Sequence, residues 1–346
     1  MNMESPESWF HRRATNYVEA QILFHLNQAG VLQALRRRGP CTAAEVAQTL
    51  DLDPAVTDAL LDYVFGIDDL LDRNDAGQYS LSAFGERVLA RYSDGGSDIE
   101  SSSINMFDVR VGAYGPVWQK LGGMLKGELR HGVDFHREGR FAENGVTKIA
   151  HHFVGAICEA IDRLGVGAAL EVGTTTGLLG QLSERRPSLA LYGLDKNRRA
   201  LDVTKEALHL APCDIRLFHA DFLSVSDWAE SINGDRPGLI FSLHFHEILA
   251  HGVDRLAAAL RVLRQRLPGW VVLALEQPRF PQSERSSLPE TLWLYGQSNI
   301  LIHHLIGNGR ILSREDWVSL GNLAGCEKVT DTPCDYLGYR AFAFYL

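Results

Sequence analysis

The 346-residue sequence has no long apolar run, and its five cysteines include no close pair. A membrane-spanning helix needs about 20 consecutive apolar residues, and a structural zinc site needs ligands at short, regular spacing. The opening residues, MNMESPESWFHRR, lack the apolar core of a secretory signal peptide. We therefore expect a cytoplasmic protein with reduced thiols and no membrane partner.

Positive charge is also scarce. Lys and Arg together number 34 against 43 Asp and Glu, which gives a net charge of −9. An acidic chain repels phosphate backbones, so we expect no nucleic-acid partner. The remaining composition, 45% hydrophobic and 22% charged, is that of an ordinary globular protein. A chain of this length predicts two domains with a sizeable core.

The first 100 residues favour a helical module with one hairpin. Residues 8–38 carry apolar side chains at helical spacing, and Thr42 with Glu45 forms a capping box for the next helix. A further helix, then strand, turn and strand, completes the pattern of a winged helix. Its second helix, residues 54–67, carries acidic and no basic side chains, unlike a DNA-recognition helix. This favours a dimerisation or substrate-lid module over DNA binding, and we predict that residues 1–100 form a dimerisation domain that joins two copies.

Residues 101–164 follow a Gly- and Ser-rich stretch and again show helical spacing. We expect them to form linker helices or a lid over a small-molecule substrate. Tyr114 and Trp118 share one helical face and are candidate walls of the substrate pocket. A packed helix face would explain both residues equally well.

From residue 165 the pattern changes to short apolar runs that alternate with helical segments. This alternation is typical of a parallel sheet with helices on both faces. We therefore predict an α/β, Rossmann-like domain over residues 165–346, with RAFAFYL near the end as its last strand.

The run ALEVGTTTG, residues 169–177, ends a predicted strand and opens a helix. Gly173 permits a sharp turn, and the helix N-terminus offers free N–H groups. The run is not the Gly-x-Gly-x-x-Gly of dinucleotide-binding folds, and the carboxylate of Glu171 suits a cationic ligand. Asp195 ends the next strand, 24 positions after Glu171, where a carboxylate can accept both hydroxyls of a ribose.

This run resembles the first motif of class I S-adenosylmethionine-dependent methyltransferases, acid-x-Gly-x-Gly-x-Gly, with Thr175 at the central glycine. The resemblance implies a seven-stranded sheet, S-adenosyl-L-methionine as cofactor and a dimer joined through the winged helix. It also implies that Asp221 binds the adenine amino group and that Phe222 covers the adenine face. The implied cofactor-binding residues are Glu171, Gly173, Thr174, Gly177, Asp195, Asp221, Phe222 and Ser242.

The fourth predicted strand runs into SLHFHEI, residues 242–248. In small-molecule O-methyltransferases, which this segment resembles, a His-acid pair at this place supplies the general base. His246 and Glu247 match that pair, and imidazole accepts a proton near neutral pH. His244, two positions earlier, is a further candidate for the base or for a cofactor contact.

A later segment, LIHHLIGNGRILSREDW, contains His303 and His304. It resembles the iron-dependent C-methyltransferases of 2-oxo acids such as phenylpyruvate, in which a His lies 13 residues before the Trp of the last helix. Trp317 places that His at His304. The resemblance implies that His246 and His304 bind iron, or another divalent metal, which chelates the oxo acid and stabilises its enolate. Glu247 is then a third ligand or orients a bound water.

The carboxylate of a 2-oxo acid suits an Arg fork, and Arg130 is the candidate. We therefore expect a C-methyltransferase that methylates the β-carbon of a 2-oxo acid, in amino-acid or antibiotic-like natural-product biosynthesis. Two alternatives stay open. One is an O-methyltransferase of a small aromatic hydroxyl, with His246 as general base. The other is a methyltransferase-like binding or regulatory protein without catalytic activity.

Overall fold

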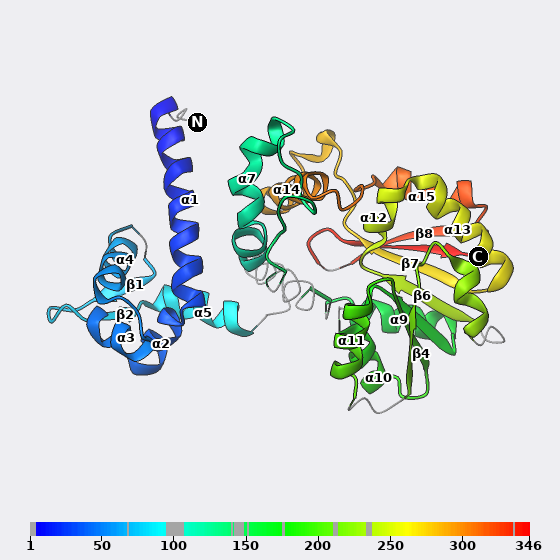
Figure 1. The fold of residues 1–346 in the computed structure, drawn as a ribbon, viewed down its shortest axis with the longest axis horizontal. Helices are drawn as coiled ribbons and strands as arrows, with labels where there is room; N and C mark the ends of the chain where they lie inside the picture. The colour runs from blue at the N-terminus through cyan, green and yellow to red at the C-terminus, as the bar shows by residue number, and fades with distance from the viewer. Residues whose placement is uncertain are drawn as a thin grey trace. The chain divides into compact units, whose positions relative to one another are not determined.

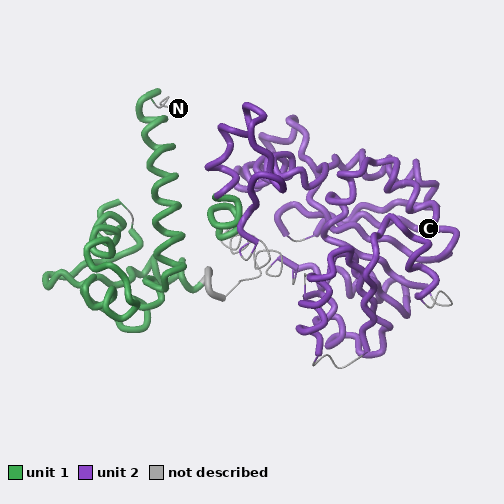
Figure 2. Tube along the Cα trace, viewed as in Figure 1, with its two compact units in different colours: residues 1–115 green, residues 116–346 purple. Residues whose placement is uncertain are grey.

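The computed structural model divides the chain into two compact units, residues 1–115 and 116–346 (Figure 2). The division lies within the segment 101–164 that was predicted to hold linker helices. The structure describes residues 5–67, 69–94, 107–139, 141, 149–150, 152–174, 177–209, 214–232, 237–334 and 336–346.

The first unit is helical with one short hairpin, as the sequence predicts. The helix expected over residues 8–38 is interrupted, however, because Gly30 adopts a left-handed conformation with φ +78° and ends the first segment. Its elements are α1 (Pro6–Gln28), α2 (Val31–Arg38), α3 (Ala43–Leu50), α4 (Pro54–Ile67), β1 (Leu71–Arg73), β2 (Tyr79–Leu81), α5 (Ala83–Asp94) and the π-helix η1 (Asp108–Ala113).

The predicted capping box begins α3. The Thr42 hydroxyl accepts the Glu45 backbone N–H at 3.2 Å, and the Thr42 backbone N–H donates to the Glu45 carboxylate at 2.7 Å. The core of the unit lies between α2, α3, α4 and the hairpin, and its centre is fully buried, as Leu35, Val46 and Leu61 show. This order of three helices and a hairpin is the predicted winged-helix pattern.

The second unit contains a seven-stranded sheet in the order β5-β4-β3-β6-β7-β9-β8. The first five strands of that order are parallel, and β9 runs antiparallel to both β7 and β8. The predicted α/β class is therefore confirmed. The strands are β3 (Ala168–Val172), β4 (Ala190–Asp195), β5 (Ile215–His219), β6 (Gly238–Ser242), β7 (Val271–Glu276), β8 (Lys328–Pro333) and β9 (Arg340–Tyr345).

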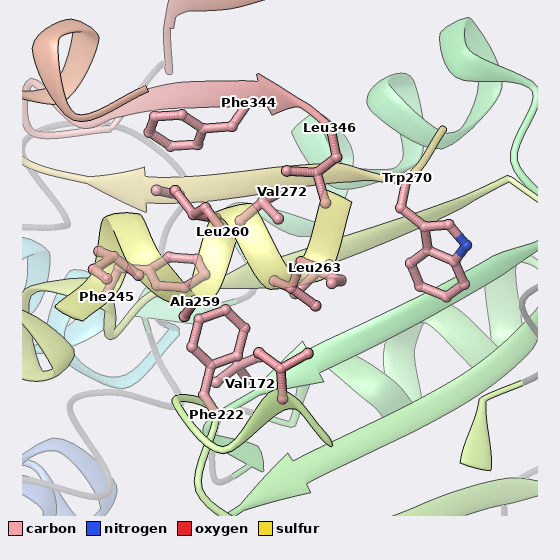
Figure 3. Close-up of a cluster of buried hydrophobic side chains, with 14 of the residues drawn as sticks. Val172, Phe222, Phe245, Ala259, Leu260, Leu263, Trp270, Val272, Phe344 and Leu346 are labelled. Carbon is pink, nitrogen blue, oxygen red and sulfur yellow. The ribbon is translucent and has the colours of Figure 1, made fainter. Parts of the chain in front are cut away.

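Helices connect these strands (Figure 1). On one face of the sheet, Leu260 and Leu263 of α13 meet strand residues such as Val172 and Val272 (Figure 3). The unit's α-helices are α7 (Gly115–Leu125), α9 (Val154–Leu164), α10 (Leu178–Arg185), α11 (Arg198–Ala207), α12 (Phe245–Ile248), α13 (Val253–Arg266), α14 (Glu290–Leu305) and α15 (Arg314–Ala324). No helix among the described residues is long and apolar enough to cross a membrane.

Candidate functional site

Polar residues gather where four neighbouring parallel strands end. Strands β3, β4, β6 and β7 lie side by side in the sheet, so their carboxyl ends share one edge, the usual ligand-binding edge of such sheets. Three of these strands end on a polar residue, Asp195, Ser242 and Glu276, and β3 ends on Val172. The loops after β3 and β6 carry the predicted cofactor motif and the predicted His-acid pair.

The loop after β3 turns at Gly173, whose φ is +83°. A side chain there would meet the ring of His244, because a Cβ would lie 2.8 Å from its Cδ2 atom. The next residue, Thr174, donates its backbone N–H to Asp195 at 3.1 Å, and the other Asp195 oxygen accepts the Asn197 N–H at 2.8 Å. The two strand ends are thus tied together at the predicted cofactor loop. Thr175 lies outside the described residues.

The other predicted cofactor residues occupy different environments. Glu171 is 1% exposed on β3, and Gly177, with φ +75°, is the N-cap of α10. Asp221 is exposed and accepts the Leu223 N–H at 2.9 Å. Their contacts with a cofactor stay predictions.

Two of the predicted cofactor residues are buried and already have partners within the protein. Phe222 is 4% exposed and packs in the hydrophobic core, with its ring beside those of Trp228 and Phe245. Figure 3 shows Phe222 among the buried side chains, and its contact with adenine stays a prediction. The Ser242 hydroxyl donates to the Val172 carbonyl at 2.7 Å and accepts the His244 N–H at 2.9 Å. Because it is 1% exposed and bonded on both sides, this hydroxyl links β6 to β3 rather than facing a ligand.

His246 is held by Glu276, which ends β7. Its Nδ1 lies 2.8 Å from Glu276 Oε2, and its backbone N–H donates to Oε1 at 3.0 Å. An ionised carboxylate only accepts, so Nδ1 carries the proton and Nε2 keeps its lone pair. Burial alone would lower the pKa of His246, but the Glu276 carboxylate outweighs burial, and the pKa is raised. The sequence did not predict that Glu276 holds His246, although an acid closing the apolar run 271–276 was a signal for it.

His303, not His304, lies against His246. The His303 and His246 ring centroids are 4.3 Å apart, whereas His304 is exposed. The predicted pairing of His246 with His304 is therefore wrong by one position, because consecutive residues of a helix point in directions about 100° apart. Burial and the neighbouring His246 together lower the pKa of His303 to about 3.

Asn308 connects His303 to Glu247. Its side-chain amide donates to Glu247 Oε1 at 2.7 Å, and its backbone carbonyl oxygen lies 3.2 Å from His303 Nδ1. A carbonyl only accepts, so Nδ1 of His303 donates and Nε2 again keeps its lone pair. Sequence reasoning did not identify Asn308, because nothing in the local pattern marks a loop amide as part of a site.

His244, His246 and Glu247 form a cluster whose ligating atoms lie within 4.8 Å of one another. Burial would raise the pKa of Glu247, but His244 and His246 together with Asn308 lower it to about 2. Burial lowers the pKa of His244. Two imidazoles and a carboxylate at this spacing are a donor set that suits a divalent transition metal.

The role of Arg130 in binding a substrate carboxylate stays a prediction. Arg130 is exposed, whereas Arg137 is half-buried and adds to the local electrostatics by lowering the pKa of His303 and of Glu247.

Tyr114 is buried in the first unit, and Trp118 is half-buried on α7. Their part in a substrate pocket stays a prediction.

No protein-family model matches the chain, and no curated protein matches its sequence. Solved structures match it over nearly its whole length. Human N-acetylserotonin methyltransferase in complex with SAM is 16% identical, with a TM-score of 0.68 over 99% of this chain and 98% of that one. Mitomycin 7-O-methyltransferase MmcR is 15% identical, with a TM-score of 0.67 over 98% of both chains. PigF with SAH is 18% identical, with a TM-score of 0.66 over 99% of both. The chain therefore has the fold of S-adenosylmethionine-dependent methyltransferases.

Proposed function

We propose that the protein is an S-adenosylmethionine-dependent O-methyltransferase of a small hydroxyl-bearing molecule, with His246 as general base. The observation that carries this proposal is the buried His246–Glu276 pair, two residues along the chain from His244, which lies against the glycine loop that follows β3. O-methyltransferases among the structures of the same fold support it. This hypothesis replaces C-methylation of a 2-oxo acid as the main one.

The strand ends fit the cofactor. The chain turns sharply at Gly173, and Asp195 offers carboxylate oxygens where the ribose hydroxyls are expected. The buried carboxylate of Glu171 suits the positive charge of the ligand. When bound, the cofactor supplies a methyl group on a positively charged sulfur, which an oxygen nucleophile attacks.

The chain's own residues prepare the nucleophile. With Nδ1–H donated to Glu276, Nε2 of His246 is the atom that takes the proton from the substrate hydroxyl. The Glu276 carboxylate then balances the positive charge of the protonated His246 ring, as the raised pKa of His246 indicates. His303 stays neutral near pH 7, because its pKa is about 3, and does not compete for the proton.

The test compares His246→Ala with His304→Ala in a methyl-transfer assay on a panel of aromatic hydroxyl compounds. His246→Ala should lower turnover by about 10²- to 10⁴-fold, which is what a general base contributes. It should leave cofactor binding unchanged in calorimetry, while the exposed His304→Ala behaves like wild type. Full turnover in His246→Ala would refute the base assignment. Absence of cofactor binding by the wild-type protein would favour the non-catalytic alternative.

A second candidate is the metal-assisted C-methylation of a 2-oxo acid, with His303 in place of His304. His246 and His303 each use Nδ1 to bond an oxygen, Glu276 and the Asn308 carbonyl respectively. Metal-binding histidines commonly show this arrangement, which aims Nε2 at the ion. The residues that would hold the metal are His246 and His303, with His244 and Glu247 beside them. A bound metal would supply Lewis-acid chemistry to the oxo acid.

Metal analysis separates the two candidates. Protein purified without chelator should contain about one equivalent of metal if the C-methyltransferase hypothesis holds, and His303→Ala should lose it while His304→Ala keeps it. The O-methyltransferase hypothesis instead expects no stoichiometric metal and full activity in EDTA.

A further inference from the structure

Helix α14 carries two polar side chains, Asn299 and His303, on one face. They are four positions apart, so they lie one helical turn apart, with Cβ atoms about 5–6 Å from each other. The His303 ring is buried against His246. The Asn299 Nδ2 donates to Gln277 Oε1 at 3.1 Å, and Gln277 directly follows Glu276, which bonds His246. Asn299 is therefore one turn from the ring beside the base and one residue from the partner of the base.

The hydrogen bonds of Gln277 fix which way the Asn299 amide is turned. Gln277 is buried, and its Nε2 donates to the Leu337 carbonyl at 2.7 Å. A backbone carbonyl only accepts, so the Gln277 amide cannot be turned over, and its Oε1 faces Asn299. Asn299 must then direct Nδ2 at Gln277, which leaves its Oδ1 pointing away from Gln277. Because Asn299 is half-buried, a ligand can reach its side chain.

The turn that contains Leu337 is held firmly against α14. Leu337 has a φ of +39°, a left-handed conformation that is strained for a residue with a side chain and persists only where the surroundings fix it. The Phe280 ring packs against both the turn and the helix. A Cβ at Gly338 would lie 2.7 Å from this ring, and a Cβ at Gly296 of α14 would lie 2.8 Å from it. The groups that orient the Asn299 amide are thus in place before a ligand binds, which lowers the cost of binding.

We propose that Asn299 Oδ1 accepts a hydrogen bond from the substrate, so that the substrate carries a second hydrogen-bond donor besides the hydroxyl that His246 deprotonates. The inference rests on the proposed function in taking His246 as the base. Asn299 contacts the substrate, and Gln277 is a positioning residue that acts through Asn299. Because about 5–6 Å separates Asn299 from His303 along the helix face, the two substrate groups stand meta or para on an aromatic ring and not ortho.

The test compares resorcinol with m-cresol, and hydroquinone with p-cresol. Each cresol has a methyl group of similar size in place of one hydroxyl, so the members of a pair differ by one donor. Binding is followed by the ring-proton NMR signals of His246 and His303, assigned with single-residue variants. In at least one pair, the dihydroxy compound should bind about ten-fold more tightly than the cresol, because the cresol leaves Asn299 Oδ1 without a partner.

Two variants of α14 locate the origin of this preference. Asn299→Leu keeps the size of the side chain and removes the acceptor, so the dihydroxy compound and its cresol should bind about equally. Gln297→Leu is the matched control, because it replaces an exposed amide on the same helix. It should keep the full preference.

The role of Gln277 is tested with a ligand that offers only an acceptor. In Gln277→Leu the Asn299 amide stays in place but can turn over, so that Nδ2 can face the ligand. The wild-type preference for resorcinol over m-hydroxybenzaldehyde, or for hydroquinone over the para isomer, should therefore narrow by about three-fold or more. A purely structural effect would weaken both ligands alike and leave their ratio unchanged, and that result would remove Gln277 as a positioning residue.

The proposal is overturned if neither dihydroxy compound binds more tightly than its cresol, which includes the case in which no compound shifts the histidine signals. It is also overturned if Asn299→Leu keeps the preference. Failure of the proposed function looks different. Full methyl transfer by His246→Ala would refute the base assignment, whereas the binding preferences need no turnover and would persist.

Discussion

Glu276 contacts His246 at two points, with one carboxylate oxygen on the backbone N–H at 3.0 Å and the other near Nδ1 at 2.8 Å. The first contact fixes where the residue sits, and the second fixes the rotation of its ring and the position of its proton. Because Glu276 is 2% exposed and ends β7, an interior strand of the sheet, the buried sheet sets the orientation of the His246 ring.

The first prediction concerns Glu276→Gln. Without the carboxylate, the pKa of His246 falls, since the charge that raises it is gone. The neutral imidazole is the active form, so activity is lost as pH falls through this pKa. The acidic limb of the kcat/KM profile should therefore move to lower pH, and the plateau should drop by about ten- to a hundred-fold, because a weaker and less oriented base remains. The exposed Glu290→Gln is the control, and an unmoved limb would exclude the coupling.

The second prediction concerns acid stability. The pKa of His303 is lowered from 6.5 to about 3 in the folded protein, so folding favours its neutral form. That stability is complete above pH 6.5 and is lost as pH falls toward 3, which amounts to about 2 kcal/mol by pH 5. His303→Leu should lose less unfolding free energy than wild type between pH 7 and 5, measured by urea denaturation. The exposed His304→Leu should match wild type, and equal losses in all three proteins would contradict the prediction.

The third prediction concerns the cofactor. Asp195→Ala removes the carboxylate expected to bind the ribose and frees the Thr174 N–H that it holds. S-Adenosylmethionine affinity, measured by calorimetry, should fall by about 1–3 kcal/mol. Asp202→Ala, on the exposed surface of α11, is the matched control. An affinity equal to wild type would remove Asp195 from the site.

The fourth prediction concerns assembly. We propose that residues 1–100 join two copies, because α1 exposes large apolar side chains, among them Trp9 at 43% and Phe10 at 69%. Light scattering should give twice the protomer mass of 38.4 kDa. The double substitution Trp9→Ser with Phe10→Ser should lower it to one protomer, whereas Leu125→Ser, at an 82% exposed position of the second unit, should not. A wild-type mass of one protomer would refute the proposal.

The fold was predictable because its signals are local and repeated. Apolar strand runs alternate with helical patterns from residue 165 onward, and the capping box at Thr42 marks a helix start by itself. The break at Gly30 was harder to predict, because the helical periodicity continues through it. A glycine inside such a pattern ends a helix only when tertiary packing favours the left-handed turn.

The sequence predicted which segments contribute to the site, but not which residue of each segment faces it. The segment containing His246 was identified, but the choice between His303 and His304 depends on the rotation of α14, which packing decides. The same holds for burial on the 130–137 loop, where Arg137 is half-buried and Arg130 is exposed although the two have similar local patterns. Phe222 follows a strand that was correctly predicted, yet its ring turned toward the core.

The close packing of Gly309 on the His246 carbonyl has a consequence for how variants of this protein would be interpreted. Even alanine at this position would push the loop away from His246, and its left-handed φ of +90° adds strain for any side chain. In a saturation mutagenesis screen, substitutions of Gly309 would therefore lower activity as substitutions of His246 and Glu276 do. Gly309 nevertheless has no side chain that could take part in the reaction. Such a position does not tolerate substitution because two backbone segments pack too closely for a side chain, and not because the residue takes part in proton transfer.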